Sequence, residues 1–300
     1  MNTPLTVTSQ VQKSTNDRIL KSLIPSVIEK LWDLNPELFM GTIEELFMRP
    51  KPYQIRDREK MFMSKAVVDT LFIEDTFQTI TTYEWRQEKS NAPVVLVSHG
   101  WAARSSQMVT QMQGLFEKGY TVISYDQTAH GLSTGSSTNL FDFILVQSRV
   151  LQRFTEVEYI VAHSMACSAT LVNLSTHPWI RKATLISPHR DILQEIGYWF
   201  SRAGIQGKLL ERIIHNMSGR YNLNFEEVRG RIAHSLKEKE LLIIHDTEDS
   251  ECPYHEAEKL HYEAPKSSFM KTEGLGHFRI IRSSSVLEKM ATWMAEPAKL

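Results

Sequence analysis

Ser164 stands where an apolar run changes into a run of small residues, in the stretch VAHSMACSA (161–169). A serine at the junction of a buried strand and a helix can act as a nucleophile when a sharp turn exposes its hydroxyl. It can equally act as a helix N-cap, which is the commoner role of such a serine. The usual nucleophile pattern is G-x-S-x-G, and Ala162 and Ala166 replace both glycines here. The pattern by itself therefore leaves both roles open.

A serine nucleophile needs a histidine base and a carboxylate that orients the base. His277 lies in TEGLGHFRII, on a glycine-flanked segment after a β-like run, and Asp249 lies in LLIIHDTEDSECP, after another. Loops that leave the carboxyl ends of parallel strands meet at one edge of the sheet. The order Ser164, Asp249, His277 is then the order of nucleophile, acid and base in such a sheet. We therefore predict that these three residues form a catalytic triad.

Four carboxylates compete for the role of the acid: Asp246, Glu248, Asp249 and Glu251. Asp246 directly follows the strand, where a short side chain is expected to bond to neighbouring backbone as the chain turns. Asp249 lies three residues further on and four before Pro253, which gives it the reach to meet a histidine on the adjacent loop. We assign the acid to Asp249.

A tetrahedral intermediate needs preorganised N–H donors for its oxyanion. The backbone N–H of Met165, at the start of a helix, is one candidate. The second is the N–H of Trp101 in SHGWAARS, where Gly100 lets the backbone approach closely. The alternative for this segment is a plain strand-to-helix turn that contains a glycine.

The remaining histidines favour structural roles. His130 lies in the glycine-containing loop YDQTAHGLSTG, and the side chain of His163 is expected to point away from the site into packing around the turn. His255 and His261 lack a metal-ligand spacing, and no Cys/His cluster indicates zinc. No G-x-G-x-x-G follows a strand and no Walker-type loop is present. The sequence therefore predicts neither a metal nor a cofactor.

The elements that must position these residues follow an alternating pattern. Short apolar runs separated by amphipathic stretches predict a parallel sheet with helical crossovers. The expected strands of this kind are 94–100, 121–126, 157–164, 182–188 and 240–246, and the expected helices between them are 105–118, 139–154 and 165–176. An antiparallel hairpin (66–73 and 77–85) precedes this core, and a further strand (267–274) and a closing helix (286–295) follow it.

Two segments lie outside the alternation. Residues 1–66 are expected to form a polar tail and a helical extension, and residues 67–300 the main domain. Residues 189–239 are too long for a simple connection, so we expect a helical lid insertion above the strand ends. Its aromatic group of Tyr198, Trp199 and Phe200 would face an acyl pocket or the core. The alternative is an ordinary amphipathic helix packed on the sheet.

Composition excludes several function classes. The net charge of −1, from 34 basic and 35 acidic residues, offers no field to hold nucleic acid. The sequence contains no run of eighteen apolar residues, so it predicts no membrane-spanning helix. The two cysteines do not form a spaced framework, which favours a reducing, cytoplasmic location. The oligomeric state cannot be read from these features.

With the motifs in this order, the sequence resembles the α/β-hydrolase fold family over residues 67–297. The segments that carry the resemblance are SHGW, YDQTAHGLS, AHSMA, IHDTEDSECP and GLGHF. It implies an eight-stranded, mostly parallel sheet flanked by helices, and hydrolysis through an acyl-enzyme. Asp246 occupies the place of the family's glycine after the strand-end histidine.

The expected function is that of a serine hydrolase that acts on a small-molecule acyl substrate, and we predict that this substrate is a carboxylic ester. Thioesters, lactones and acyl transfer to an acceptor other than water use the same machinery and stay open. Dehalogenases and epoxide hydrolases of this fold carry an aspartate at the elbow, and Ser164 argues against them. A non-catalytic protein that binds ligands or partners through the same pocket is the alternative from another class.

Overall fold

The protein is built on a single sheet of eight strands. The computed structural model describes residues 30, 32–35, 47–201, 205–220 and 224–297. The strand order is β1-β2-β4-β3-β5-β6-β7-β8; β2 is antiparallel to both neighbours, and the pairs from β4 to β8 are parallel. The strands are β1 (Val67–Ile73), β2 (Gln78–Trp85), β3 (Val94–Ser98), β4 (Thr121–Tyr125), β5 (Val157–His163), β6 (Lys182–Ile186), β7 (Glu240–Asp246) and β8 (Ser267–Thr272). The predicted mostly parallel, eight-stranded sheet is confirmed.

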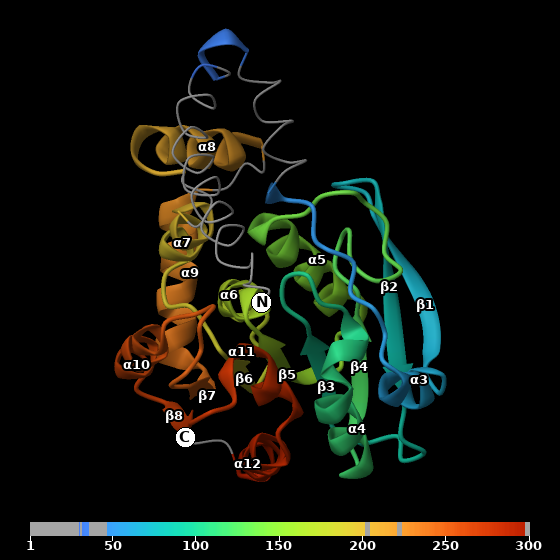
Figure 1. The fold of residues 1–300 in the computed structure, drawn as a ribbon. Helices are drawn as coiled ribbons and strands as arrows, with labels where there is room; N and C mark the ends of the chain where they lie inside the picture. Colours follow the sequence, from blue (N-terminus) through green and yellow to red (C-terminus); the bar gives the residue numbers. More distant parts are fainter. Residues whose placement is uncertain (1–29, 31, 36–46, 202–204, 221–223, 298–300) are drawn as a thin grey trace, which may run out of the picture. The chain divides into compact units, whose positions relative to one another are not determined.

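Helices cover both faces of the sheet (Figure 1). On one face α4 packs against α12 and α3, and on the other α6 packs against α5 and α9. The strands β3, β4, β6 and β7 are buried at every position, which is why they appear in the sequence as mostly apolar runs, with polar residues chiefly at their ends. The helical elements are α3 (Asp57–Met63), η1 (Ser105–Met108), α4 (Val109–Glu117), α5 (Leu140–Arg153), α6 (Met165–Asn173), α7 (Ile192–Ser201), α8 (Gly207–Arg220), α9 (Phe225–Glu238), α10 (Tyr254–Glu263), α11 (Gly276–Arg279), η2 (Ile280–Arg282) and α12 (Ser284–Ala295).

The chain divides into two units. One consists of Met1–Phe47 with Leu193–Leu223, and the other of Met48–Ile192 with Asn224–Leu300. The second unit holds the whole sheet and also α9, which packs against α6. The boundaries expected from the sequence, at 66/67 and around the 189–239 insertion, stay predictions. Most of the helical pattern expected before residue 47 lies outside the described residues.

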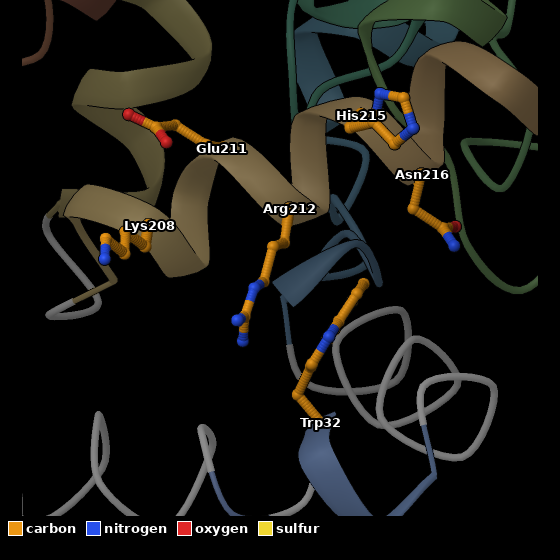
Figure 2. A pocket seen from close by; sticks show the side chains of 6 residues that line it. All are labelled: Trp32, Lys208, Glu211, Arg212, His215 and Asn216. Carbon is orange, nitrogen blue, oxygen red and sulfur yellow. The ribbon is translucent and has the colours of Figure 1, made fainter.

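In the smaller unit, the N-terminal segment contacts α7 and α8. The ring of Phe200 is buried, and its centroid lies 6.4 Å from that of the Phe47 ring. The Nη1 atom of Arg212 lies 3.5 Å from Oδ1 of Asp33. The side chains of Tyr198 and Trp199 are outside the described residues. Figure 2 shows an open hollow in this unit, lined by Trp32 and by polar side chains of α8.

The carboxylate of Asp126 joins the loops that follow β3 and β4. Its Oδ1 accepts a hydrogen bond from the Ser105 N–H (2.8 Å), and its Oδ2 accepts one from the Tyr83 hydroxyl (2.8 Å). Oδ2 also accepts the N–H of Leu132 (2.9 Å). Gly131 has a φ of +56°, and a Cβ built there would lie 1.8 Å from Oδ2. The loop can close around the carboxylate only with a glycine at this position.

A buried lysine holds the last helix. Lys182 begins β6 and is 1% exposed. Its Nζ donates to the carbonyls of Trp293 (2.9 Å) and Glu296 (2.7 Å), at the C-terminal end of α12. The ammonium group thus satisfies terminal carbonyls and lies at the negative end of the helix dipole.

Gly131→Ala should destabilise the protein more than Gly119→Ala. Both glycines have positive φ, so an alanine at either position costs about 1–2 kcal/mol in backbone strain. Only at Gly131 does the new methyl group clash, whereas the space beside Gly119 is open. The clash should add about 1–3 kcal/mol. Urea unfolding followed by circular dichroism measures the difference, and equal losses would contradict the packing argument.

Candidate active site

Ser164 lies in a strained turn between β5 and α6. Its φ is +56° and its ψ −128°, a conformation that costs a non-glycine residue of order 1–3 kcal/mol. The Ser164 N–H donates to the carbonyl of Ile186 in β6 (2.9 Å), and its own carbonyl accepts from the Cys167 N–H (2.8 Å). Although Ser164 occupies the N-cap position of α6, its hydroxyl makes no capping hydrogen bond. The geometry is that of a sharp strand-to-helix elbow, and it disfavours the capping role.

Small residues surround this elbow. Ala162 and Ala166 are fully buried. A Cβ built on Gly100 would lie 2.8 Å from the Cβ of Ser164 and 3.1 Å from the carbonyl oxygen of His163. The loop after β3 therefore passes directly against the elbow, as the sequence predicted for Gly100.

His277 and Asp249 form a buried, hydrogen-bonded pair. The distance from His277 Nδ1 to Asp249 Oδ2 is 2.8 Å. Asp249 is on the loop after β7, and His277 is in α11, just after β8. The ring of His163, the residue before Ser164, lies 4.7 Å from the His277 ring, and its Nε2 lies 2.9 Å from the His277 carbonyl oxygen. Since that oxygen can only accept, His163 donates from Nε2.

The carboxylate of Asp249 is surrounded by donors. Its Oδ1 accepts the N–H groups of Glu251 (2.9 Å) and Cys252 (2.8 Å). His245 Nε2 lies 3.4 Å from Oδ2 and 3.1 Å from the Cys252 carbonyl oxygen. Burial acts to raise the pKa of Asp249, but the hydrogen bonds from His245 and His277 outweigh it and hold the pKa well below its usual range. Asp249 is thus an ionised acceptor for His277.

Two neutral histidines form hydrogen bonds with the backbone of the loop that contains Trp101. His99 Nδ1 lies 2.7 Å from the Gly100 carbonyl oxygen, and its Nε2 accepts the Gln127 N–H (3.0 Å). His130 Nε2 accepts the Ala102 N–H (3.0 Å), so Nδ1 carries the proton and donates to the Thr128 carbonyl (2.9 Å). His130 therefore has the structural role expected from the sequence.

The pKa values of four buried histidines are low. Burial, which disfavours the charged imidazolium, lowers the pKa of His99 and of His189 to about 4. It likewise lowers the pKa of His130 and of His163 to about 3. All four therefore stay neutral near pH 7 and act as fixed hydrogen-bonding groups or packing partners.

The contacts of His245 and the position of His189 were not predicted from the sequence. His245 lies four residues before Asp249, at the end of an apolar strand where a polar residue is unusual, and this was the available signal. His189 follows β6, and its pKa is sensitive to the charges of His277, His245 and Asp249, so it belongs to the same cluster. Asp246 bonds to the backbone N–H groups of Glu248 and Leu275, in agreement with the sequence analysis.

Across the part of the chain that the structure describes, no group of three or more His, Cys, Asp or Glu side chains is arranged to hold a metal ion. Over the same residues, no helix combines the length and the apolar character needed to cross a membrane.

Comparison with known proteins agrees with this geometry. Residues 94–283 match the model of the alpha/beta hydrolase family, so the chain belongs to that family. No curated protein matches the chain in a sequence search. Because the family match spans the elbow, the acid loop and the histidine loop, the resemblance inferred from the motifs is confirmed.

Solved structures share the fold at low identity. An esterase from Pyrococcus furiosus is 18% identical, with a TM-score of 0.60 over 82% of this chain and 96% of its own. Est1E from Butyrivibrio proteoclasticus is 14% identical, with a TM-score of 0.58 over 76% of this chain and 99% of its own. The thioesterase domain from the curacin biosynthetic pathway is 16% identical, with a TM-score of 0.53 over 77% of this chain and 100% of its own. At these identities the likeness establishes the fold.

We expect the free energy of unfolding to fall as the pH is lowered from about 6.5 toward about 4. A histidine whose folded pKa lies below its unfolded value of about 6.5 binds more protons when unfolded, so its contribution is complete above that value and is lost below it. Each such histidine contributes up to about 1.4 kcal/mol per pH unit. His163→Gln should therefore reduce the slope of stability against pH in urea unfolding.

The matched control is His255→Gln, which removes an imidazole whose side chain is 59% exposed. It should leave the slope close to that of the wild type. If the two variants changed the slope equally, burial would not be the origin of the pH dependence.

Proposed function

We propose that this protein is a serine hydrolase that cleaves carboxylic esters through an acyl-enzyme on Ser164. The observation that carries the proposal is the 2.8 Å contact of His277 with an ionised Asp249, together with the strained elbow at Ser164, whose neighbour His163 has its ring 4.7 Å from that of His277. A serine hydroxyl, an imidazole and a carboxylate that orients the imidazole are the groups that together activate a nucleophile.

In this mechanism, His277 Nε2 takes the proton of the Ser164 hydroxyl as Oγ attacks the acyl carbonyl. Asp249 holds the Nδ1–H and stabilises the imidazolium that forms. The tetrahedral oxyanion would be bound by the N–H groups of Met165 and Trp101. Collapse of the intermediate breaks the bond to the alcohol, which receives the proton from Nε2, and water then repeats the sequence to release the acid.

The oxyanion assignment is supported by the loop geometry. The Ala102 N–H is engaged by His130, and Ala102 has a φ of +50°, which turns the chain sharply after Trp101. Gly100, the residue before Trp101, lies against Ser164. The Met165 N–H is at the N-terminus of α6, where the helix dipole favours negative charge.

Thioester cleavage and acyl transfer use the same groups, and the likeness to a thioesterase domain as well as to an esterase keeps them as second candidates. We further propose that residues 189–239 form a lid, that the substrate is a small acyl compound, and that the protein is located in the cytoplasm. Initial rates with p-nitrophenyl esters of rising chain length, compared with acyl thioesters, would rank the substrates.

A fluorophosphonate probe should label the folded protein on Ser164, as read by peptide mass spectrometry, because only an activated serine attacks the phosphorus. Ser164→Ala should abolish the adduct, while Ser168→Ala, which alters a buried serine one turn along α6, should keep it. Folded wild-type protein without an adduct would favour the non-catalytic, ligand-binding alternative.

Asp249→Asn should lower turnover roughly 10⁴-fold, since an amide favours the wrong histidine tautomer, as in the serine-protease template. Steady-state kinetics on a p-nitrophenyl ester, corrected for the folded fraction, gives the ratio. Glu248→Gln is the control, because that neighbouring carboxylate is exposed and should matter little. The opposite pattern would show that Asp249 is not the acid.

A further inference from the structure

Asp246 is a second buried carboxylate beside the acid, and the mechanism above does not use it. It ends β7, three residues before Asp249, and is fully buried. Its Oδ2 accepts hydrogen bonds from the Thr272 hydroxyl (2.7 Å) and the Leu275 N–H (2.9 Å). Its Oδ1 accepts the Glu248 N–H (3.0 Å). One carboxylate thus contacts the end of β8, the histidine loop and the acid loop.

The histidine loop is shaped to receive this carboxylate. Leu275 is in the right-handed helical region (φ −88°, ψ −35°), and Gly276 is in the left-handed region (φ +60°). Successive residues in these two conformations turn their N–H groups to one side and form an anion-binding concavity. The Gly276 N–H accordingly also helps to lower the pKa of Asp246. Glycine permits the left-handed step without strain.

Both members of the catalytic pair are attached to this arrangement. His277 directly follows Gly276, and its carbonyl is held from the other side by His163 (2.9 Å). The Asp249 N–H donates to the Asp246 carbonyl (3.2 Å). The side chain of Asp246 therefore fixes the histidine loop, while its backbone fixes the start of the acid turn.

The charge of Asp246 matches its surroundings. Burial acts to raise its pKa, but the hydrogen bonds from Gly276, Thr272 and the other donors outweigh it, so the pKa is lowered. Asp246 is thus an ionised carboxylate near pH 7 that accepts hydrogen bonds from Glu248, Thr272 and Leu275. A glycine here, as in the family pattern, would offer the loop no acceptor.

We propose that Asp246 is a positioning residue that sets the distance and orientation of His277 relative to Asp249 by binding the backbone of the histidine loop. The proposal rests on the proposed hydrolase function for its catalytic consequence. Displacement of a catalytic group by about 1 Å can cost about 100-fold in rate. The loss should fall on kcat, because Asp246 is fully buried and its hydrogen-bond partners Glu248 and Leu275 belong to the loops that hold Asp249 and His277.

Asp246→Asn should lower kcat by about 10- to 100-fold, the usual effect of removing an outer partner of a functional group, with KM changed much less. The amide leaves one acceptor oxygen and places an NH₂ against N–H donors. A ¹H NMR signal from the His277 Nδ1–H, assigned by its loss in Asp249→Asn, should weaken.

Three controls separate positioning from charge and from stability. Thr272→Val removes one hydrogen bond without changing the charge and should give a smaller loss of kcat, while Thr272→Ser keeps the hydroxyl and should restore it. Glu240→Gln alters a buried carboxylate at the opposite end of β7, about 20 Å away, and should lower the melting temperature without lowering kcat per folded molecule.

The outcomes are distinguishable. If Asp246→Asn and Thr272→Val retain wild-type kcat and the NMR signal, the positioning role is wrong while the hydrolase function stands. If the wild type hydrolyses no ester but the signal is present and is weaker in Asp246→Asn, the hydrolase function fails and the positioning role stands. If Asp246→Asn does not fold, the Thr272→Val and Thr272→Ser pair decides, and equal kcat in these two variants would overturn the proposal.

Discussion

The left-handed backbone of Ser164 is the constraint on which the other parts of the site depend. A serine holds a φ of +56° only when its surroundings over-determine it. Here the N–H is fixed by β6, the carbonyl by the first turn of α6, and the Cβ side is closed by Gly100. The small residues Ala162 and Ala166 follow from this, because strand and helix meet within a few ångströms of each other at the turn.

The loops around the elbow are held by neutral imidazoles. His99, His130 and His163 each use one ring nitrogen to donate to a backbone carbonyl. In two of them the other nitrogen accepts a backbone N–H. An imidazole can do both only in its neutral form, and burial keeps it in that form. These three residues therefore fix the positions of the loops through hydrogen bonds to the backbone. His277 differs from them because its Nδ1 is hydrogen-bonded to a carboxylate.

The fold could be predicted from the sequence because its signals are local. Strands β3, β4, β6 and β7 are mostly apolar runs, and the glycines and prolines around them mark the turns. The pairing of Asp249 with His277 followed from topology, since loops after parallel strands share an edge. The helix α9, by contrast, carries many charged residues on its exposed face. Its apolar positions, such as Val228 and Ile232, are too few for the sequence to predict that it packs on α6.

The finer parts of the site depend on conformations that residue types do not specify. That Asp246 bonds to backbone could be inferred from its place at a turn, but its partners could not. They are set by the right-handed Leu275 and left-handed Gly276, which lie some thirty residues away. The contact of His245 with Asp249 was hidden for a similar reason, because it requires the acid loop to fold back over the strand end.

The buried ammonium of Lys182 also bears on the order in which parts of the chain can fold during synthesis. Its acceptor on Trp293 is 111 residues further along the chain, so during synthesis this cation exists long before the carbonyls that will receive it. A buried cation without partners is strongly unfavourable. The Glu240 carboxylate of β7, 3.8 Å from the Lys182 ammonium, is synthesised well before α12 and can neutralise the cation first, whereas the two carbonyl acceptors become available only with α12.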